Sequence, residues 1–85
     1  MTKKQLNNIK NILIGTETTL KEISNIVIDI FNCYDPLDFN GENELLDNGS
    51  ISFDWLDDNG TMEGINVIFE VVDSETVKVI EIDTI

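Results

Sequence analysis

The chain has 85 residues, with 17 Asp and Glu, five Lys, no Arg and no His, so its net charge is −12. This length predicts a single domain over residues 1–85 with a thin core, because so short a chain buries only about 60% of its unfolded surface. The missing His and Arg exclude Ser-His-Asp and Cys-His catalysis and bidentate phosphate clamps. Five cations on an acidic chain also argue against direct nucleic-acid binding, whose affinity comes mostly from neutralised phosphates.

Cysteine usage and apolar runs bear on the cellular location. The single Cys33 cannot form an internal disulfide, and cysteine zinc sites need several ligands. The first residues are basic, but no uninterrupted apolar stretch follows them, so they do not resemble a secretory signal. No run approaches the ~20 apolar residues of a membrane span. We therefore expect a cytoplasmic protein without a cofactor and without membrane contact.

The first part of the chain predicts two helices, which together cover residues 3–32. In residues 3–14, apolar side chains recur at three- and four-residue spacing, and Gly15 is a plausible stop. A second helix should run to about Asn32 and begin either after Thr16 or at Thr19, which has capping-box spacing with Glu22. Its inward side chains are expected to be Leu20, Ile23, Ile26, Val27, Ile30 and Phe31. The β-branched run at 26–28 leaves a strand there as the competing interpretation.

The rest of the chain predicts an acidic loop and then a sheet. Residues 33–49 are polar and rich in turn formers, with a helical turn near 42–46 as an alternative. From residue 50 to residue 84, apolar and polar side chains alternate in three runs separated by short turns, which indicates an antiparallel β-meander. The expected fold is α+β in the order α-α-β-β-β, with both helices on one face of a three-stranded sheet.

Side-chain parity predicts the length of the first hairpin loop. A two-residue turn at 59–60 would put the apolar sets of the two strands on opposite faces of the sheet. A three-residue loop at 58–60 pairs Phe53 with Ile65 and places both apolar sets on one face. Gly60 then takes the left-handed position of a type I turn with a bulge.

The second turn decides which side chains of the last strand face outward. A two-residue loop at 74–75 places Ile80 and Ile82 on the inner face. The outer face is then expected to mix aliphatic and carboxylate side chains: Asp54, Leu56, Ile68, Glu70, Val72, Val77, Val79, Glu81 and Asp83. Because the helices cover only one face, this one should stay exposed.

Calcium is one candidate ligand of the acidic loop. Placing Gly41 at position 6 of an EF-hand loop puts Asp38 and Asp47 at ligand positions, but position 1 is then Pro36, which has no ligand atom in its side chain. The stretch at 57–60 fails in the same way. We favour an acidic turn-rich loop without a metal site, with weak divalent-ion binding as the alternative.

Three further candidates have simpler explanations. Carboxylate pairs arise by density alone among 17 acids, and a chain of this size leaves little volume for a catalytic cleft, so we expect no enzyme. Cys33 lacks the positive field that activates a thiol and is expected to be a small buried or half-buried apolar residue. Trp55 is expected in the core of the first strand, with a contact anchor as the alternative.

The acidity is the most informative feature. Residues 1–28 hold four Lys and two Glu, a sum of +2, whereas residues 29–85 hold 15 acids and one Lys, a sum of −14. Solubility is the simpler explanation, but this charge exceeds what solubility requires and opposes compaction. Outward carboxylates on strands recur every ~7 Å, with neighbouring strands ~5 Å away. That density is comparable to the one charge per ~1.7 Å of duplex DNA.

These observations favour a non-catalytic inhibitor or interaction protein that binds a basic surface of a nucleic-acid-processing protein as a nucleic-acid mimic. The expected electrostatic contacts are Asp38, Glu42, Glu44, Asp47, Asp54, Asp57, Asp58, Glu63, Glu70, Glu81 and Asp83. The expected apolar contacts are Leu56, Ile68, Val77 and Val79. In size, acidity and lack of catalytic groups the chain is similar to small phage inhibitors of host defence, including anti-CRISPR proteins, without matched residues. A structural module or homodimer using the outer face, or a calcium-dependent module, is the alternative.

Overall fold

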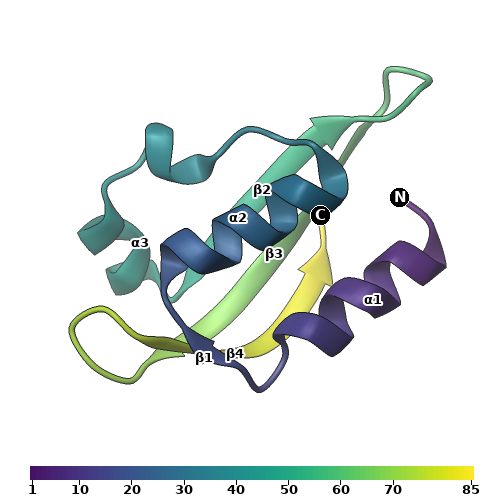
Figure 1. Ribbon diagram of the computed structural model, residues 1–85. Coiled ribbons are helices and arrows are strands. Elements are labelled where there is room, and N and C mark those ends of the chain that lie inside the picture. Colours follow the sequence, from purple (N-terminus) through teal and green to yellow (C-terminus); the bar gives the residue numbers. More distant parts are fainter.

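The computed structural model describes residues 1–85 and has an α+β fold with a curled antiparallel sheet (Figure 1). The elements are α1 (Lys3–Leu13), β1 (Glu17–Thr18), α2 (Leu20–Phe31), the 3-10 turn η1 (Pro36–Asp38), α3 (Glu42–Asn48), β2 (Ser50–Leu56), β3 (Met62–Val71) and β4 (Val77–Thr84). The strands lie in the order β1-β4-β3-β2. The α+β class and the antiparallel sheet are confirmed. α3 lies where a helical turn was the alternative to a loop, and β1 is an addition to the predicted fold. None of the helices has the length and apolar character needed to cross a membrane.

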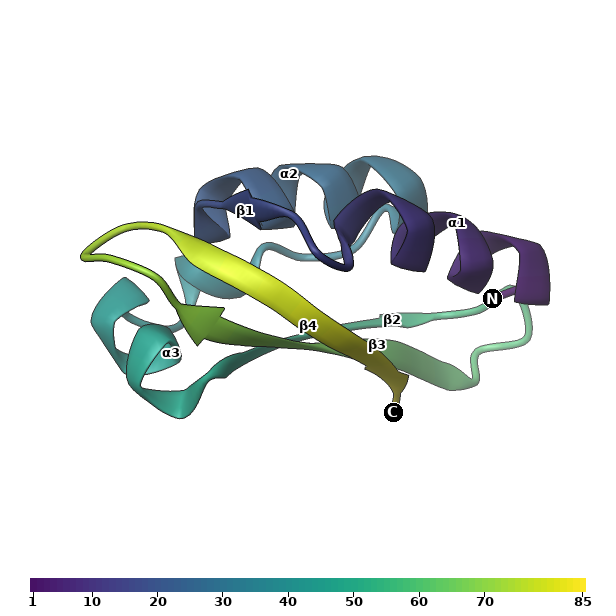
Figure 2. The same ribbon diagram turned by 90° about the horizontal axis from the view of Figure 1, so that it is seen from below.

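The two longer helices, α1 and α2, lie side by side on one face of the sheet, as expected (Figure 2). Fourteen buried apolar residues form the core between these helices and the sheet. On α1, Ile9 and Leu13 are fully buried, whereas Ile12, which the same three- and four-residue spacing would place on their stripe, is 48% exposed. Burial of this core is the main source of stability, because helices this short are marginal in isolation.

Local hydrogen bonds fix where the helices begin and end. Thr2 and Gln5 form a reciprocal capping box at the start of α1. The Thr19 hydroxyl accepts a hydrogen bond from the Glu22 amide at 3.2 Å, so α2 starts at the later of the two predicted positions. α2 ends at Phe31, and its C-cap Asn32 has a left-handed φ of 53°. The helix rather than the strand interpretation of its last turns is correct.

The segment before α2 forms a short edge strand that the sequence did not indicate. In β1, Glu17 pairs with Lys78 and Thr18 with Val77. Just before it, the Gly15 amide donates to the Val79 carbonyl at 2.8 Å, and the Val79 amide donates to the Thr16 carbonyl at 3.0 Å. These bonds satisfy backbone groups of β4 that would otherwise lack a partner within the protein.

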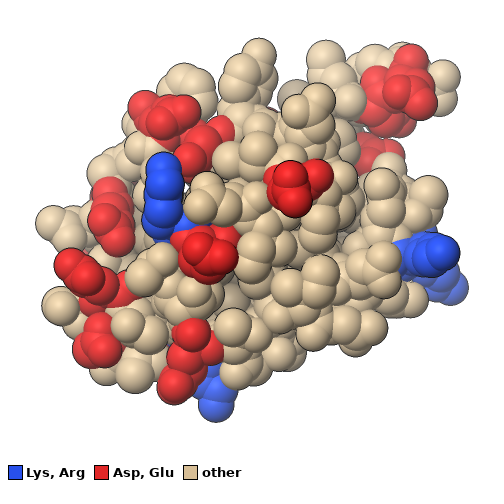
Figure 3. Space-filling view, viewed as in Figure 1, with Lys and Arg blue, Asp and Glu red and all other residues tan.

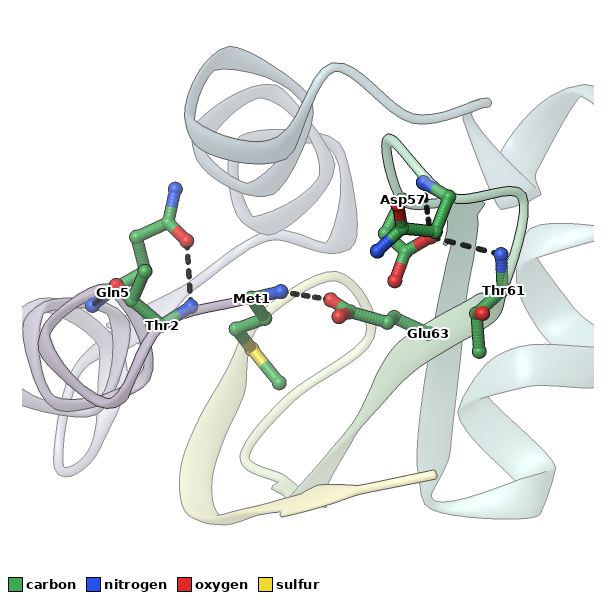
Figure 4. A network of polar contacts seen from close by, with 7 residues as sticks. Met1, Thr2, Gln5, Asp57, Thr61 and Glu63 are labelled. Carbon is green, nitrogen blue, oxygen red and sulfur yellow. Dashed lines mark hydrogen bonds and ion pairs between the residues drawn. The ribbon is translucent and has the colours of Figure 1, made fainter.

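The β2–β3 hairpin has the predicted register. Phe53 lies opposite Ile65 and Ile51 opposite Val67. Gly60 has a φ of 79°, the left-handed conformation that the three-residue loop requires. The Asp57 carboxylate stabilises this loop by accepting hydrogen bonds from the backbone amides of residues 59 and 61 (Figure 4).

The β3–β4 pairing differs from the prediction near the turn. Here Phe69 lies opposite Val79, whereas farther along Val67 lies opposite Ile82, as predicted, because a β-bulge shifts the register between the two pairs. Val77 and Val79 are therefore fully buried, and Ile80 is 46% exposed. The prediction that Val77 and Val79 face outward is wrong, and so is the inward position of Ile80.

The turn itself explains the shift. The Val72 amide donates to the Thr76 carbonyl at 2.8 Å, which leaves three residues, 73–75, in the loop instead of the expected two. The Asp73 carboxylate accepts hydrogen bonds from the amides of Glu75 and Thr76, at 3.0 and 2.9 Å, and holds this longer loop. The bulge then restores the pairing that keeps Ile82 inside.

Candidate functional site

We define the outer face as the sheet surface turned away from α1 and α2, which leave it uncovered (Figure 2). Residues directly opposite each other in neighbouring strands point to the same face, so the pairing gives the order of side chains across it. Three rows across the strands are Ser52–Asn66–Asp83, Ser50–Ile68–Glu81 and Glu70–Lys78–Glu17. Asp54, opposite Gly64, and Leu56, opposite Met62, continue the surface toward the end of β2.

Carboxylates dominate the charge of this outer face. The exposed acidic side chains on it are Glu17, Asp54, Glu70, Glu81 and Asp83. Lys78 is the only cation in the strands, and it lies directly opposite both Glu70 and Glu17. Four of the acids were predicted from the alternation along the strands. Glu17 was missed because its place in the sheet depends on pairing with a residue far away in the sequence.

The uncharged part of the outer face combines polar and aliphatic groups. The Ser52 hydroxyl and the Asn66 side-chain oxygen form a hydrogen bond of 2.9 Å between β2 and β3. Leu56 and Met62 are 63% and 61% exposed, and Ile68 is half-buried. Leu56 and Ile68 thus remain candidates for apolar contact with a partner, whereas Val77 and Val79 are inaccessible in the core.

Glu63 does not belong to the outer face. It lies opposite Trp55, on the side of the sheet that carries the helices, and its carboxylate forms an ion pair with the amino group of Met1 (Figure 4). This is the only ion pair in the protein. The predicted role of Glu63 in partner binding is therefore corrected: its charge is compensated within the fold.

The remaining predicted acids lie at the β2–β3 hairpin tip and in the segments that precede β2. Asp57 and Asp58 are at the hairpin tip, and Asp57 is already engaged in the loop. The exposed acids before β2 are Asp38 of η1 and Glu42, Glu44 and Asp47 of α3. Figure 3 shows acidic side chains gathered near α3 and the β3–β4 turn and again at the hairpin tip, with a largely uncharged surface between them. The structure thus divides the predicted acids among three surfaces.

A groove opens where the end of α2 meets the end of β2. Phe31 and Trp55 stack there, with ring centroids 4.4 Å apart and an angle of 11° between their planes. The groove has a volume of about 600 Å³ and is lined by Phe31, Asn32, Cys33, Tyr34, Asp54, Trp55, Leu56 and Asp58. Trp55 is half-buried against the core, as predicted, and it also lines this groove, while its role as a contact anchor stays a prediction.

Cys33 is the one thiol in the groove. Burial raises the pKa of the Cys33 thiol, and the nearby Asp54 and Asp35 carboxylates raise it further. A thiol of this kind is a poor nucleophile at neutral pH, because the thiolate is the reactive form. The half-buried position of Cys33 matches the prediction.

The segment proposed as a calcium loop folds differently from an EF-hand loop. Residues 36–38 form η1 and residues 42–48 form α3, so the oxygen atoms of Asp38 and Asp47 belong to separate helical turns. No group of three or more His, Cys, Asp or Glu side chains lies close enough together to hold a metal ion.

No protein-family model matches the chain, and neither curated proteins nor solved structures give a match.

Proposed function

We propose that the protein is a small non-catalytic inhibitor that binds a basic surface of a nucleic-acid-processing protein, in the manner of a nucleic-acid mimic. The observation that carries this proposal is the outer face, where four exposed carboxylates of β2, β3 and β4 share a rigid sheet with a single Lys. A cytoplasmic location, as for inhibitors of host defence in phage-infected bacteria, is part of the same proposal.

The spacing of the carboxylates supports mimicry. Glu81 and Asp83 are two residues apart on β4, which places their side chains about 7 Å apart on one face. Asp54 and Glu70 lie on neighbouring strands, so negative charge is spread across the width of the sheet. A basic groove that binds a phosphate backbone would meet a comparable array here, with fast and salt-sensitive association.

Apolar side chains on the same face would add specificity. Leu56 and Ile68 lie beside Asp54 and Glu81 on this face, and their burial in a complex would contribute free energy that does not depend on salt. Electrostatic contacts steer association, whereas a few buried contacts carry most of the binding energy.

The test is capture of partners from bacterial lysate with a tagged protein, followed by elution in a salt gradient and mass spectrometry. The triple variant Asp54→Lys, Glu70→Lys, Glu81→Lys reverses the outer face. A matched control, Glu22→Lys, Asp29→Lys, Glu75→Lys, changes the net charge equally through exposed acids of α2 and the β3–β4 turn. Circular dichroism verifies that both variants are folded.

We expect the wild type and the control variant to retain a basic nucleic-acid enzyme that elutes at moderate salt, and the outer-face variant to lose it. Equal retention by the folded outer-face variant would contradict the proposal.

A homodimer through the outer face is the second candidate, because the exposed side chains of Leu56 and Met62 could pair with a second copy. Facing carboxylates would repel in such a dimer, so its association should strengthen with added salt, whereas a complex with a basic partner should weaken. Sedimentation velocity at low and high salt separates the two.

A further inference from the structure

One long edge of the sheet has unpaired backbone groups. β2 is an edge strand. At its two ends, the Phe69 amide donates to the Gly49 carbonyl and the Asp57 amide donates to the Thr61 carbonyl, at 3.0 and 2.9 Å. In an antiparallel pair these bonds recur at every second residue, so the odd-numbered residues of β2 direct their backbone groups to β3.

The even-numbered residues of β2 therefore direct their backbone groups away from the sheet. These are Ser52, Asp54 and Leu56 in the part of the strand next to the hairpin. The segment 32–40 passes beside this edge, and no backbone hydrogen bond joins it to β2. A free edge of this kind is a template for pairing with another strand.

The groove described above lies along this same edge. Cys33 and Tyr34 line one side of it, and Asp54, Trp55 and Leu56 line the other. A second hollow of about 180 Å³ continues past Tyr34 to Ser52 and Phe53. Free backbone groups and space for side chains thus coincide over residues 52–56.

The charge around the groove determines which kind of peptide segment can bind along the β2 edge. Asp54 and Asp58 line the groove, and Asp35 lies close enough to raise the pKa of Cys33. A second copy of this chain would bring its own Asp54 and a net charge of −12 to the same edge, which is repulsive. An extended segment rich in Lys or Arg carries the complementary charge.

We propose that the β2 edge and its groove bind an extended basic peptide segment of a partner as an additional antiparallel strand. The phase of the pairing follows from the geometry. A peptide residue that exchanges hydrogen bonds with Asp54 points its side chain to the same face as Asp54, which suits a cation. The alternate residues point toward Trp55 and the groove, which suits an apolar side chain. This surface shares Asp54 and Leu56 with the outer face but does not include Glu70 or Glu81, so the inference goes beyond the proposed function.

The test uses a blocked heptapeptide, Lys-Val-Lys-Val-Lys-Val-Lys, in titrations followed by calorimetry and by the fluorescence of Trp55, the only Trp in the chain. Two further peptides carry N-methyl groups, either on the Lys residues or on the Val residues. Both keep the charge and the side chains, but each removes the backbone donors of one peptide edge only.

We expect the unmodified and the Val-methylated peptides to bind with a shift in Trp55 fluorescence. The Lys-methylated peptide should bind at least about tenfold more weakly, because it loses up to three backbone hydrogen bonds to β2. Equal affinity of the two methylated peptides would overturn the proposal, since charge alone would then explain the binding. No binding of the unmodified peptide would overturn it as well.

Two protein variants test where on the molecule the peptide binds. Tyr34→Ser removes a groove side chain that is 80% exposed and should weaken the peptide without unfolding the domain. The pair Glu70→Lys, Glu81→Lys alters the outer face and should leave the difference between the two methylated peptides intact. The opposite pattern would place the peptide on the outer face and contradict the edge proposal. Failure of the edge proposal would leave the proposed function open to its own test, because the lysate experiment measures capture of a protein partner and not binding of this peptide.

Discussion

Gly64 is the residue of the sheet where a side chain cannot be accommodated. A Cβ atom there would lie 2.5 Å from the Phe53 carbonyl oxygen and 3.0 Å from Cδ1 of Ile85, which lies against this position. Because the first contact is with backbone, the strand pair must shift to relieve it. We predict that Gly64→Ala lowers the free energy of unfolding by about 1–3 kcal/mol, as overpacking typically does.

Urea denaturation measures this change. Gly41→Ala is the matched control, because a Cβ atom at Gly41 meets no atom within 4 Å and its backbone is not left-handed. Its loss should be below about 1 kcal/mol, the scale of a changed N-cap residue. Equal losses in the two variants would show that the close approach at Gly64 is absent.

Cys33 gives a prediction of pH dependence. Burial raises the pKa of its thiol in the folded state, so the reactive thiolate is scarcer in the folded than in the unfolded chain at any pH below that raised pKa. Alkylation by iodoacetamide should therefore have a pH–rate midpoint at higher pH in the folded protein than in urea. A folded-state midpoint equal to or below the unfolded one would contradict the described environment of Cys33.

Among the elements, β4 is the strand whose observed pairing differs from the predicted pairing. Val79 is fully buried and Ile80 is 46% exposed at the bulge, whereas a two-residue turn would exchange their positions. We predict that Val79→Asp unfolds the domain, because a carboxylate without a partner cannot be buried. Ile80→Asp should change the free energy of unfolding by less than about 1 kcal/mol, as surface substitutions usually do. Thermal melting followed by circular dichroism distinguishes them, and the reverse order would show that the bulge is absent.

The two hairpins show what the sequence could predict about this fold. In β2 and β3 only one loop length puts both apolar sets on one face, so parity alone gave the register. In β4 the residues at 77, 79, 80 and 82 are all apolar. Either set of alternate residues would therefore bury aliphatic side chains, and parity does not determine which set faces inward. The turn at 73–75 determines it through the hydrogen bonds of the Asp73 carboxylate, about which the alternation of apolar residues gives no information.

The candidate site was predictable to a similar degree. Asp54, Glu70, Glu81 and Asp83 follow from alternation and lie on the outer face. Glu63 has the parity of the inner face, and its pairing with the Met1 amino group depends on contacts between the ends of the chain and the sheet. The predicted β-meander already makes β2 an edge strand, whereas the groove beside it depends on where residues 31–34 lie, which no alternating pattern indicates.

At the scale of the whole molecule, the positive and the negative side chains lie on different parts of the fold. α1 and α2 cover one face of the sheet and hold four of the five Lys, whereas most acids lie on the sheet, its turns and α3. Seventeen acids with a single ion pair leave the net charge of −12 largely uncompensated, which weakens the compact state through self-repulsion. Binding to a basic partner would relieve that repulsion, and this is why the acidity supports an interaction role.

Competition with duplex DNA tests mimicry most directly, using a partner enzyme captured in a salt-sensitive complex. The protein and the DNA would be titrated against that enzyme at about 0.15 M salt, where long-range charge effects are largely screened. Mutually exclusive binding is predicted, with loss of competition in the Asp54→Lys, Glu70→Lys, Glu81→Lys variant. A ternary complex in which the enzyme holds both the protein and DNA at undiminished affinity would contradict the mimicry account.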